Sequence, residues 1–156
     1  MKKVKHVLAA TALLASTLMQ PVLAQSELVV DVYNPQDKSI FAVSSSIISC
    51  NNEVLLVDAQ FQRNDAQALV KKIKASGKTL TAVYISHSDP DFYFGLDVIK
   101  AAFPKAKLLA TKSTVENIKR SMQGKLNYWG PILKSNAPKE LILPEVILSN
   151  TLTIDG

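Results

Sequence analysis

The fold of this protein is indicated by residues 86–95, which have the sequence SHSDPDFYFG. The apolar run that precedes them, over residues 80–85, predicts a strand, and Phe92, Leu96 and Ile99 have the spacing of one helical face. A polar loop therefore joins the end of a strand to the start of a helix. His87 and Asp89 project to the same side of that loop if it is extended, because side chains alternate along extended backbone.

Strand and helix patterns alternate on both sides of this loop. Three strands come first, over 28–33, 40–49 and 54–57, and later strands are predicted over 80–85 and 107–110. Helices are predicted over 64–76 and 92–103, and a third helix begins with a Ser113–Glu116 capping box and stops at Gly124. A β-meander followed by such alternation predicts an α/β domain, with a mixed sheet and helices packed on it.

Beyond Lys125 the periodic signal fades. The prolines and glycines over 128–138, which include the Tyr-Trp-Gly-Pro run at 128–131, favour a long loop. Residues 151–154 alternate like a strand and are followed by Asp155-Gly156, a strong hairpin signal whose partner strand is absent. We therefore expect a chain that is truncated at its C-terminus.

The first 24 residues resemble a secretory signal peptide. Lysines at positions 2, 3 and 5 precede an apolar run over 7–19, and Val22-Leu23-Ala24 offers a cleavage site before Gln25. The apolar run is shorter than the roughly 20 residues that cross a bilayer, so a stable membrane anchor is not expected. The mature domain, 25–156, is predicted to be periplasmic or secreted.

The charge and the cysteine content of the chain exclude some classes of function. Without the signal residues the net charge falls from +5 to +2, which is too weak to predict a nucleic-acid partner. Cys50 is the only cysteine, so no internal disulfide can form. A small buried side chain is the favoured interpretation of Cys50, while its place before the Asn51-Asn52 turn leaves intermolecular pairing open.

The loop at 86–95 carries the residues that suggest chemistry. His87, Asp89 and Asp91 supply imidazole nitrogen and carboxylate oxygen within five residues, and both are ligands of divalent cations. Asp91 could also accept a proton from a bound water. The sequence therefore offers a candidate metal site, with Asp91 as its candidate catalytic residue.

This stretch resembles the metal-binding motif of the metallo-β-lactamase superfamily, Thr-His-x-His-x-Asp-His-x-Gly-Gly. His87 matches the first His, Asp91 the Asp and Gly95 the last Gly, whereas Asp89 and Phe92 stand where the second and third His belong. Asp58, in Val57-Asp58-Ala59, is similar to the strand-end Asp that supports the metal loop from behind. The resemblance covers residues 28–111 and includes no ligand from the C-terminal half of the family.

The resemblance implies the N-terminal αβ half of an αβ/βα sandwich and an exported, metal-dependent hydrolase of unknown substrate. Zinc is the implied cation, with manganese or iron as alternatives suited to carboxylates. An isolated half would leave one apolar sheet face uncovered, which predicts self-association. Two other interpretations stay open, namely a non-catalytic periplasmic binding module that has lost its metals, and an inactive fragment.

Structural interpretations of the same residues also stay open. Asp91 can cap the helix that follows it, Asp89 can be a solvated turn residue, and His87 can make an ordinary hydrogen bond. Tyr93 and Trp129 can line a pocket or shield an apolar face. The basic residues at 119, 120 and 125 are expected to be a solvated helix end.

Overall fold

A computed structural model describes residues 27–155, so the predicted signal peptide lies outside the described residues. Six strands form one sheet: β1 (Val29–Tyr33), β2 (Ser45–Ser49), β3 (Glu53–Val57), β4 (Thr79–Ile85), β5 (Lys107–Ala110) and β6 (Glu145–Val146). Four α-helices accompany it: α1 (Arg63–Ala75), α2 (Pro90–Tyr93), α3 (Leu96–Ala102) and α4 (Lys112–Leu133). Residues 27–155 also include two short 3-10 helices, η1 (Gln36–Lys38) and η2 (Lys134–Asn136).

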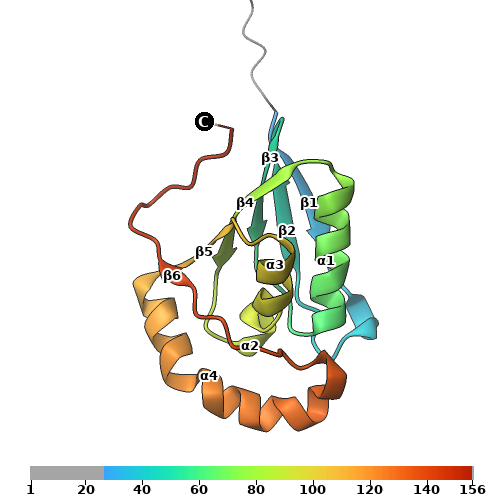
Figure 1. Ribbon diagram of the computed structural model, residues 1–156, viewed down its shortest axis with the longest axis vertical. Coiled ribbons are helices and arrows are strands. Elements are labelled where there is room, and N and C mark those ends of the chain that lie inside the picture. The colour runs from blue at the N-terminus through green and yellow to red at the C-terminus, as the bar shows by residue number, and fades with distance from the viewer. Residues whose placement is uncertain (1–26, 156) are drawn as a thin grey trace, which may run out of the picture.

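The strands lie in the sheet in the order in which they occur in the chain. β1, β2 and β3 are antiparallel neighbours, and β3, β4, β5 and β6 run parallel to one another. The carboxyl ends of the parallel strands therefore meet at one edge. Helices α2 and α4 lie at that edge, and α4 curves beneath it (Figure 1).

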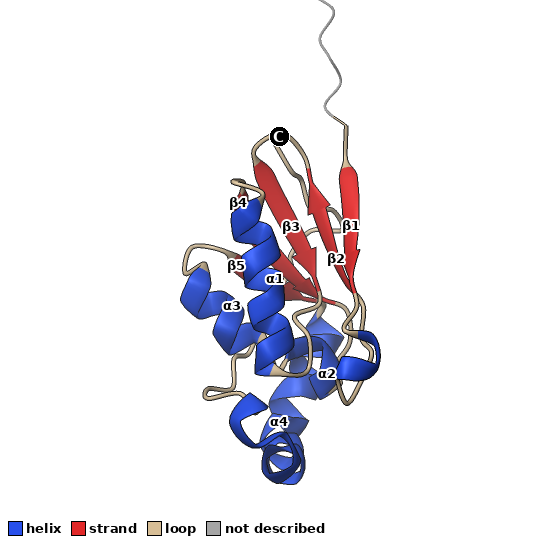
Figure 2. Ribbon diagram, turned by 90° about the vertical axis from the view of Figure 1, so that its right-hand side faces the viewer, coloured by secondary structure: helices blue, strands red, loops and turns tan. Residues whose placement is uncertain are grey.

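Helices α1 and α3 pack side by side on one face of the sheet, as Figure 2 shows. Their apolar faces meet the inward side chains of β3 and β4, and Leu56, Leu69, Val83 and Ile99 are all fully buried between the two layers. The α/β architecture predicted from the alternation of strand and helix patterns, a mixed sheet with helices on one face, is confirmed.

The opposite face of β1 is open to solvent. Asp31 accepts a hydrogen bond from Lys72 of α1, so the alternating neighbours of Asp31 point away from the helices. These neighbours, Val30 and Val32, are 58% and 55% exposed. Part of the outer face lies beside the C-terminal segment, since residues 147–152 and Tyr84 line one cavity of about 480 Å³.

Several predicted boundaries were wrong. The predicted strand at 40–49 begins only at Ser45, the helix at 92–103 is divided into α2 and α3, and the alternating residues at 151–154 form no strand. The largest error concerns α4, which continues through Gly124 and Pro131 to Leu133 where a loop was predicted. The reason is tertiary packing, because Leu126, Trp129 and Leu133 extend the apolar face of the helix onto the core.

Two further findings concern Cys50 and the membrane. Cys50 is buried, with 5% of its surface exposed, which agrees with the favoured interpretation. No helix within residues 27–155 combines the length and the apolarity needed to cross a bilayer.

Candidate functional site

Three segments meet at the carboxyl edge of the parallel strands. Residues 58–60 follow β3, residues 86–91 follow β4, and α4 passes beside the second of these loops. The first loop is joined by backbone hydrogen bonds to the helical residues that follow the second loop. The N–H of Ala59 donates to the carbonyl of Phe92 in α2 (2.7 Å), and the N–H of Gly95, just before α3, donates to the carbonyl of Gln60 (2.9 Å). The sequence-predicted site residues therefore lie on a connected framework.

Asp58 supports the second loop from the end of the neighbouring strand. Its carboxylate accepts a hydrogen bond from the backbone N–H of Ser86 (2.8 Å) and another from the Ser86 hydroxyl (2.7 Å). Burial raises the pKa of Asp58, although these hydrogen bonds and nearby His87 act in the opposite direction. Asp58 also has a positive φ of 64°, a conformation that Asp tolerates better than most residues.

The hydrogen bonds of Ser86 determine which tautomer of the His87 imidazole is present. The Ser86 hydroxyl lies 2.7 Å from Nδ1 of His87. Because its single hydrogen is donated to Asp58, the hydroxyl oxygen accepts from His87, which places the imidazole proton on Nδ1. The lone pair of a neutral His87 then lies on Nε2, where it can bind a cation or a proton. The ring is exposed and stacks on Phe92, with centroids 4.6 Å apart.

Asp91 lies in the first turn of α2 and is half-buried. Burial raises its pKa, and the nearby carboxylates of Asp89 and Asp58 raise it further, whereas its own backbone and Lys125 act in the opposite direction. A carboxylate in such a place is a stronger proton acceptor than an ordinary aspartate. Asp91 is not the helix cap, since α2 begins at Pro90 and the cap position is held by Asp89, without a side-chain capping bond.

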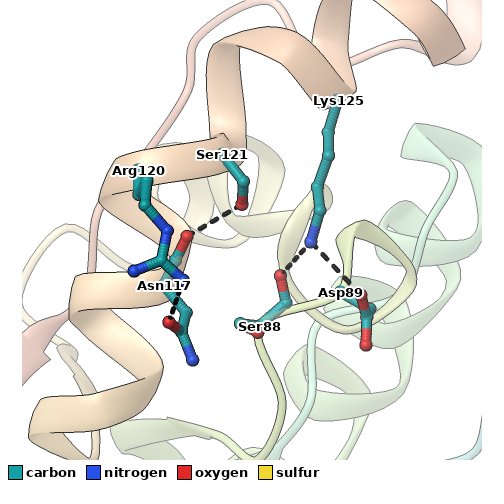
Figure 3. A network of polar contacts seen from close by, with 6 residues as sticks. All are labelled: Ser88, Asp89, Asn117, Arg120, Ser121 and Lys125. Carbon is teal, nitrogen blue, oxygen red and sulfur yellow. Dashed lines mark hydrogen bonds and ion pairs between the residues drawn. The ribbon is translucent and has the colours of Figure 1, made fainter.

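Lys125 reaches the loop from α4. Its ammonium group donates to the carbonyl oxygen of Ser88 (2.7 Å) and to Oδ1 of Asp89 (3.2 Å), as Figure 3 shows. The expectation that Lys125 belongs to a solvated helix end is therefore wrong. Arg120 is exposed, as expected, and bonds Asn117 of its own helix, but it lies in the middle of α4 and not at a helix end.

The two aromatic residues that were candidates for a pocket, Tyr93 and Trp129, pack instead against other aromatic rings. Tyr93 is only 1% exposed and its ring meets Phe94 edge to face. Its hydroxyl group is buried and has no hydrogen-bond partner among residues 27–155. Trp129 is half-buried and meets Phe41 and Phe61 edge to face, with centroids 5.3 Å apart in both pairs. Trp129 thereby anchors the C-terminal part of α4 to the framework of the site.

The donor set does not fit a complete metal site. Among residues 27–155, no group of three His, Cys, Asp or Glu side chains is placed to hold a metal ion. Asp89 is engaged with Lys125, and Phe92 contributes a ring where a ligand would be needed. His87 and Asp91 are left as donors, whereas a zinc site takes at least three protein ligands. The assignment of His87, Asp89 and Asp91 to a metal stays a prediction.

Comparisons with solved structures identify the fold. The BLEG-1 B3 metallo-beta-lactamase matches 83% of this chain with a TM-score of 0.54 and 16% sequence identity, over 57% of its own length. A metallo-beta-lactamase from Hirschia baltica matches 62% of this chain over 48% of its own, with a TM-score of 0.48 and 17% identity. For a Cronobacter sakazakii metallo-beta-lactamase with a HARLDQ motif, the match covers 51% of this chain and 29% of its own, with a TM-score of 0.43 and 23% identity.

This chain thus spans less than two thirds of the length of each of these structures. No family model matches the sequence, and no curated protein matches it. The match to the BLEG-1 structure shows the metallo-β-lactamase fold over part of its length, as the sequence resemblance predicted.

Two residues of the site are not predicted by the sequence. Ser86 has no local signal beyond its place at the start of the loop, yet its hydroxyl joins Asp58 to His87. Lys125 was grouped with the other basic residues of its helix, and only its spacing of four residues from Trp129 signals that both share one inward face.

Proposed function

We propose that this chain, which carries part of a metallo-β-lactamase fold, belongs to an exported hydrolase that attacks its substrate with water at the 86–91 loop. The observation that carries the proposal is the hydrogen-bond chain from Asp58 through Ser86 to His87, with the half-buried Asp91 four residues beyond His87 in the same loop. Such a chain holds the imidazole in one orientation and leaves the lone pair of its Nε2 available to a water molecule or a cation. Catalytic imidazoles are commonly held in this way.

In the proposed reaction Asp91 accepts a proton from water. The oxygen of that water forms a bond to the electrophilic centre of the substrate while its proton moves to the carboxylate of Asp91. The bond from that centre to the leaving group then breaks, and the proton held by Asp91 passes to the leaving group. Burial supports this role, since it raises the basicity of the carboxylate. His87 would hold the water by accepting one of its hydrogens at Nε2, and Asp58 would keep the ring in position from behind through Ser86.

A divalent cation, with zinc first and manganese or iron as alternatives, belongs to the proposal because the matched structures are named metallo-beta-lactamases. A cation bound here would supply Lewis-acid chemistry. His87 and Asp91 are the side chains left to approach it, and at least one more ligand is required than the described residues bring together.

The test is a hydrolysis screen with chromogenic esters, phosphoesters and β-lactams, run with and without added zinc or manganese. We expect Asp91→Asn and His87→Ala each to lower kcat/KM on any substrate that is turned over by about 100-fold or more, the scale of general acid–base catalysis. Asp37→Asn is the matched control, because Asp37 is exposed on η1.

Turnover that survives both variants would refute the proposed site. A full-length protein that turns over no substrate under any metal would instead support the non-catalytic binding module.

A further inference from the structure

Lys125 is a cation that the fold itself places in the candidate site. Its ammonium group contacts two oxygens of the 86–91 loop, the Ser88 carbonyl and the Asp89 carboxylate, from a helix 36 residues further along the chain. The Lys125 side chain is 24% exposed, whereas that of Asp89 is 64% exposed. The lysine is therefore largely covered, and Figure 3 shows that it extends from α4 toward the loop.

The other basic residues of α4 that make polar contacts in the described chain do not behave this way. Arg120 bonds Asn117, three residues before it on the same helix, and Lys112 pairs with Glu116 over 3.9 Å, also within the helix. Lys125 is thus distinguished by its long-range partners and not by the general basic character of the helix. Arg120 provides a natural control.

The two oxygens that Lys125 holds are of the kind that divalent cations select. A carboxylate and a backbone carbonyl are hard oxygen donors, which suit manganese or magnesium and also serve zinc. An ammonium group at 2.7 and 3.2 Å uses the same lone pairs and places a positive charge next to them. A metal ion approaching Asp89 would have to displace this group or bear its repulsion.

We infer that Lys125 is an internal cation of the site, which takes the place of a metal ion at Asp89 and keeps divalent ions away from that side of the loop. The inference rests on the proposed function for the identity of the loop as the reaction site. It accounts for the mismatch between the donor set and a metal centre, since one of the three predicted ligands is already neutralised by a residue of the same chain.

Lys125 also docks α4. Trp129 lies four residues further on, on the same face of the helix, and packs on Phe41 and Phe61. Since the helix has this second anchor, loss of the ammonium group is expected to free Asp89 without detaching α4.

The test is calorimetric titration with Mn²⁺ alone and with Zn²⁺ alone. We expect Lys125→Met to bind either ion about tenfold more tightly than the parent protein, because removal of a neighbouring positive charge favours a cation. Lys125→Arg should stay as weak as the parent, and Arg120→Met should match the parent as well. Asp89→Asn, added to Lys125→Met, should abolish the gain.

Equal affinity of Lys125→Met and the parent would overturn the inference, and so would an equal gain from Arg120→Met, which would indicate a general charge effect. Circular dichroism establishes that each variant is folded. If Lys125→Met fails to fold, Lys125→Gln, which is neutral but keeps an N–H donor, makes the same comparison. Because the titration uses the metal alone, its outcome is independent of whether hydrolysis is found.

Discussion

The backbone N–H of Gly95 donates a hydrogen bond of 2.9 Å to the carbonyl oxygen of Gln60. The two backbone segments approach so closely at this point that no side chain fits between them. A Cβ on Gly95 would collide with the carbonyl oxygen of Ala59 and press on the Ala66 side chain. The close approach holds the loop after β3 against the start of α3. The loops that carry Asp58 and His87 can therefore pack in this way only if residue 95 is glycine.

Gly95→Ala should destabilise the protein by about 2–3 kcal/mol, the usual cost of overpacking a rigid contact. Gly124→Ala is the matched control, because Gly124 lies inside α4 with open space around it. An alanine there should stabilise the helix by roughly 0.5–1 kcal/mol. Denaturant unfolding of the three proteins measures both effects, and equal behaviour of the two variants would contradict the close approach.

Asp91→Asn should raise stability at neutral pH while it lowers hydrolysis. Burial raises the pKa of Asp91 above its unfolded value, so the contribution of this group to stability is fully present at low pH and is lost as the pH rises through the folded pKa. Asparagine does not ionise, so the Asp91→Asn variant does not lose this stability as the pH rises. Thermal unfolding should therefore show a higher Tm for Asp91→Asn at pH 7, and the difference should vanish below the ordinary aspartate range.

The opposite pH trend would show that Asp91 is stabilised in its charged form. For activity, the same raised pKa predicts that kcat/KM falls as the pH drops through a value above the ordinary aspartate range, because a protonated Asp91 cannot accept a proton.

The chain over residues 25–156 should bind zinc no more tightly than roughly micromolar, about −8 kcal/mol, since the described residues bring too few ligands together. His87→Ala and Asp91→Ala should each weaken the remaining binding in titration calorimetry. Asp37→Ala is a suitable control, whereas Asp97 is not, because it is 9% exposed and paired with Arg63. Nanomolar affinity in the parent would mean that the site lies elsewhere.

The open face of β1 should promote self-association. Val30→Thr together with Val32→Thr keeps two β-branched residues in the strand and removes the apolar surface, so it should shift the protein toward monomer in size-exclusion chromatography with light scattering. Val29→Thr is the control, since Val29 is 53% exposed and lies on the other side of the same strand. A monomeric parent, or an equal shift from Val29→Thr, would argue against this face.

The first residues predict export. Protein recovered from the periplasm or the medium should begin at Gln25, because Val22-Leu23-Ala24 provides the small residues that a signal peptidase recognises. Intact-mass measurement gives the start directly. A soluble cytoplasmic protein that retains Met1 would show that residues 1–24 are not a cleaved signal.

The parts of the fold that could be predicted from the sequence are those with a local pattern. The strands at 54–57, 80–85 and 107–110 are short, largely apolar runs, and the stripe at Ala66, Leu69 and Ile73 has helical spacing. These elements are therefore correct to within one or two residues. The loop at 86–91 was located for the same reason, since its polar residues interrupt two apolar patterns.

The remainder depends on contacts between distant residues. Gly124 and Pro131 are locally unfavourable in a helix, and α4 continues because Leu126 and Trp129 pack on the core formed by other elements. The role of Lys125 depends on Ser88 and Asp89, far away in the sequence. Asp58 and Gln60 have positive φ at positions where their backbone groups bond Tyr84 and Gly95, which are likewise distant in the sequence.

The agreement between strand order and chain order has a consequence for how the molecule is made. Each strand adds to a sheet whose edge has already emerged, so folding can proceed vectorially during synthesis, and the longest connection, over residues 111–144, closes only when β6 arrives. Two contacts stand apart, because Asp155 accepts from the N–H of Asn52, 103 residues earlier, and donates its own N–H to the carboxylate of Glu53, 102 residues earlier. A ribosome-stalling series should find the sheet protected from proteolysis once β5 has left the exit tunnel, with the Asp155 contacts forming last.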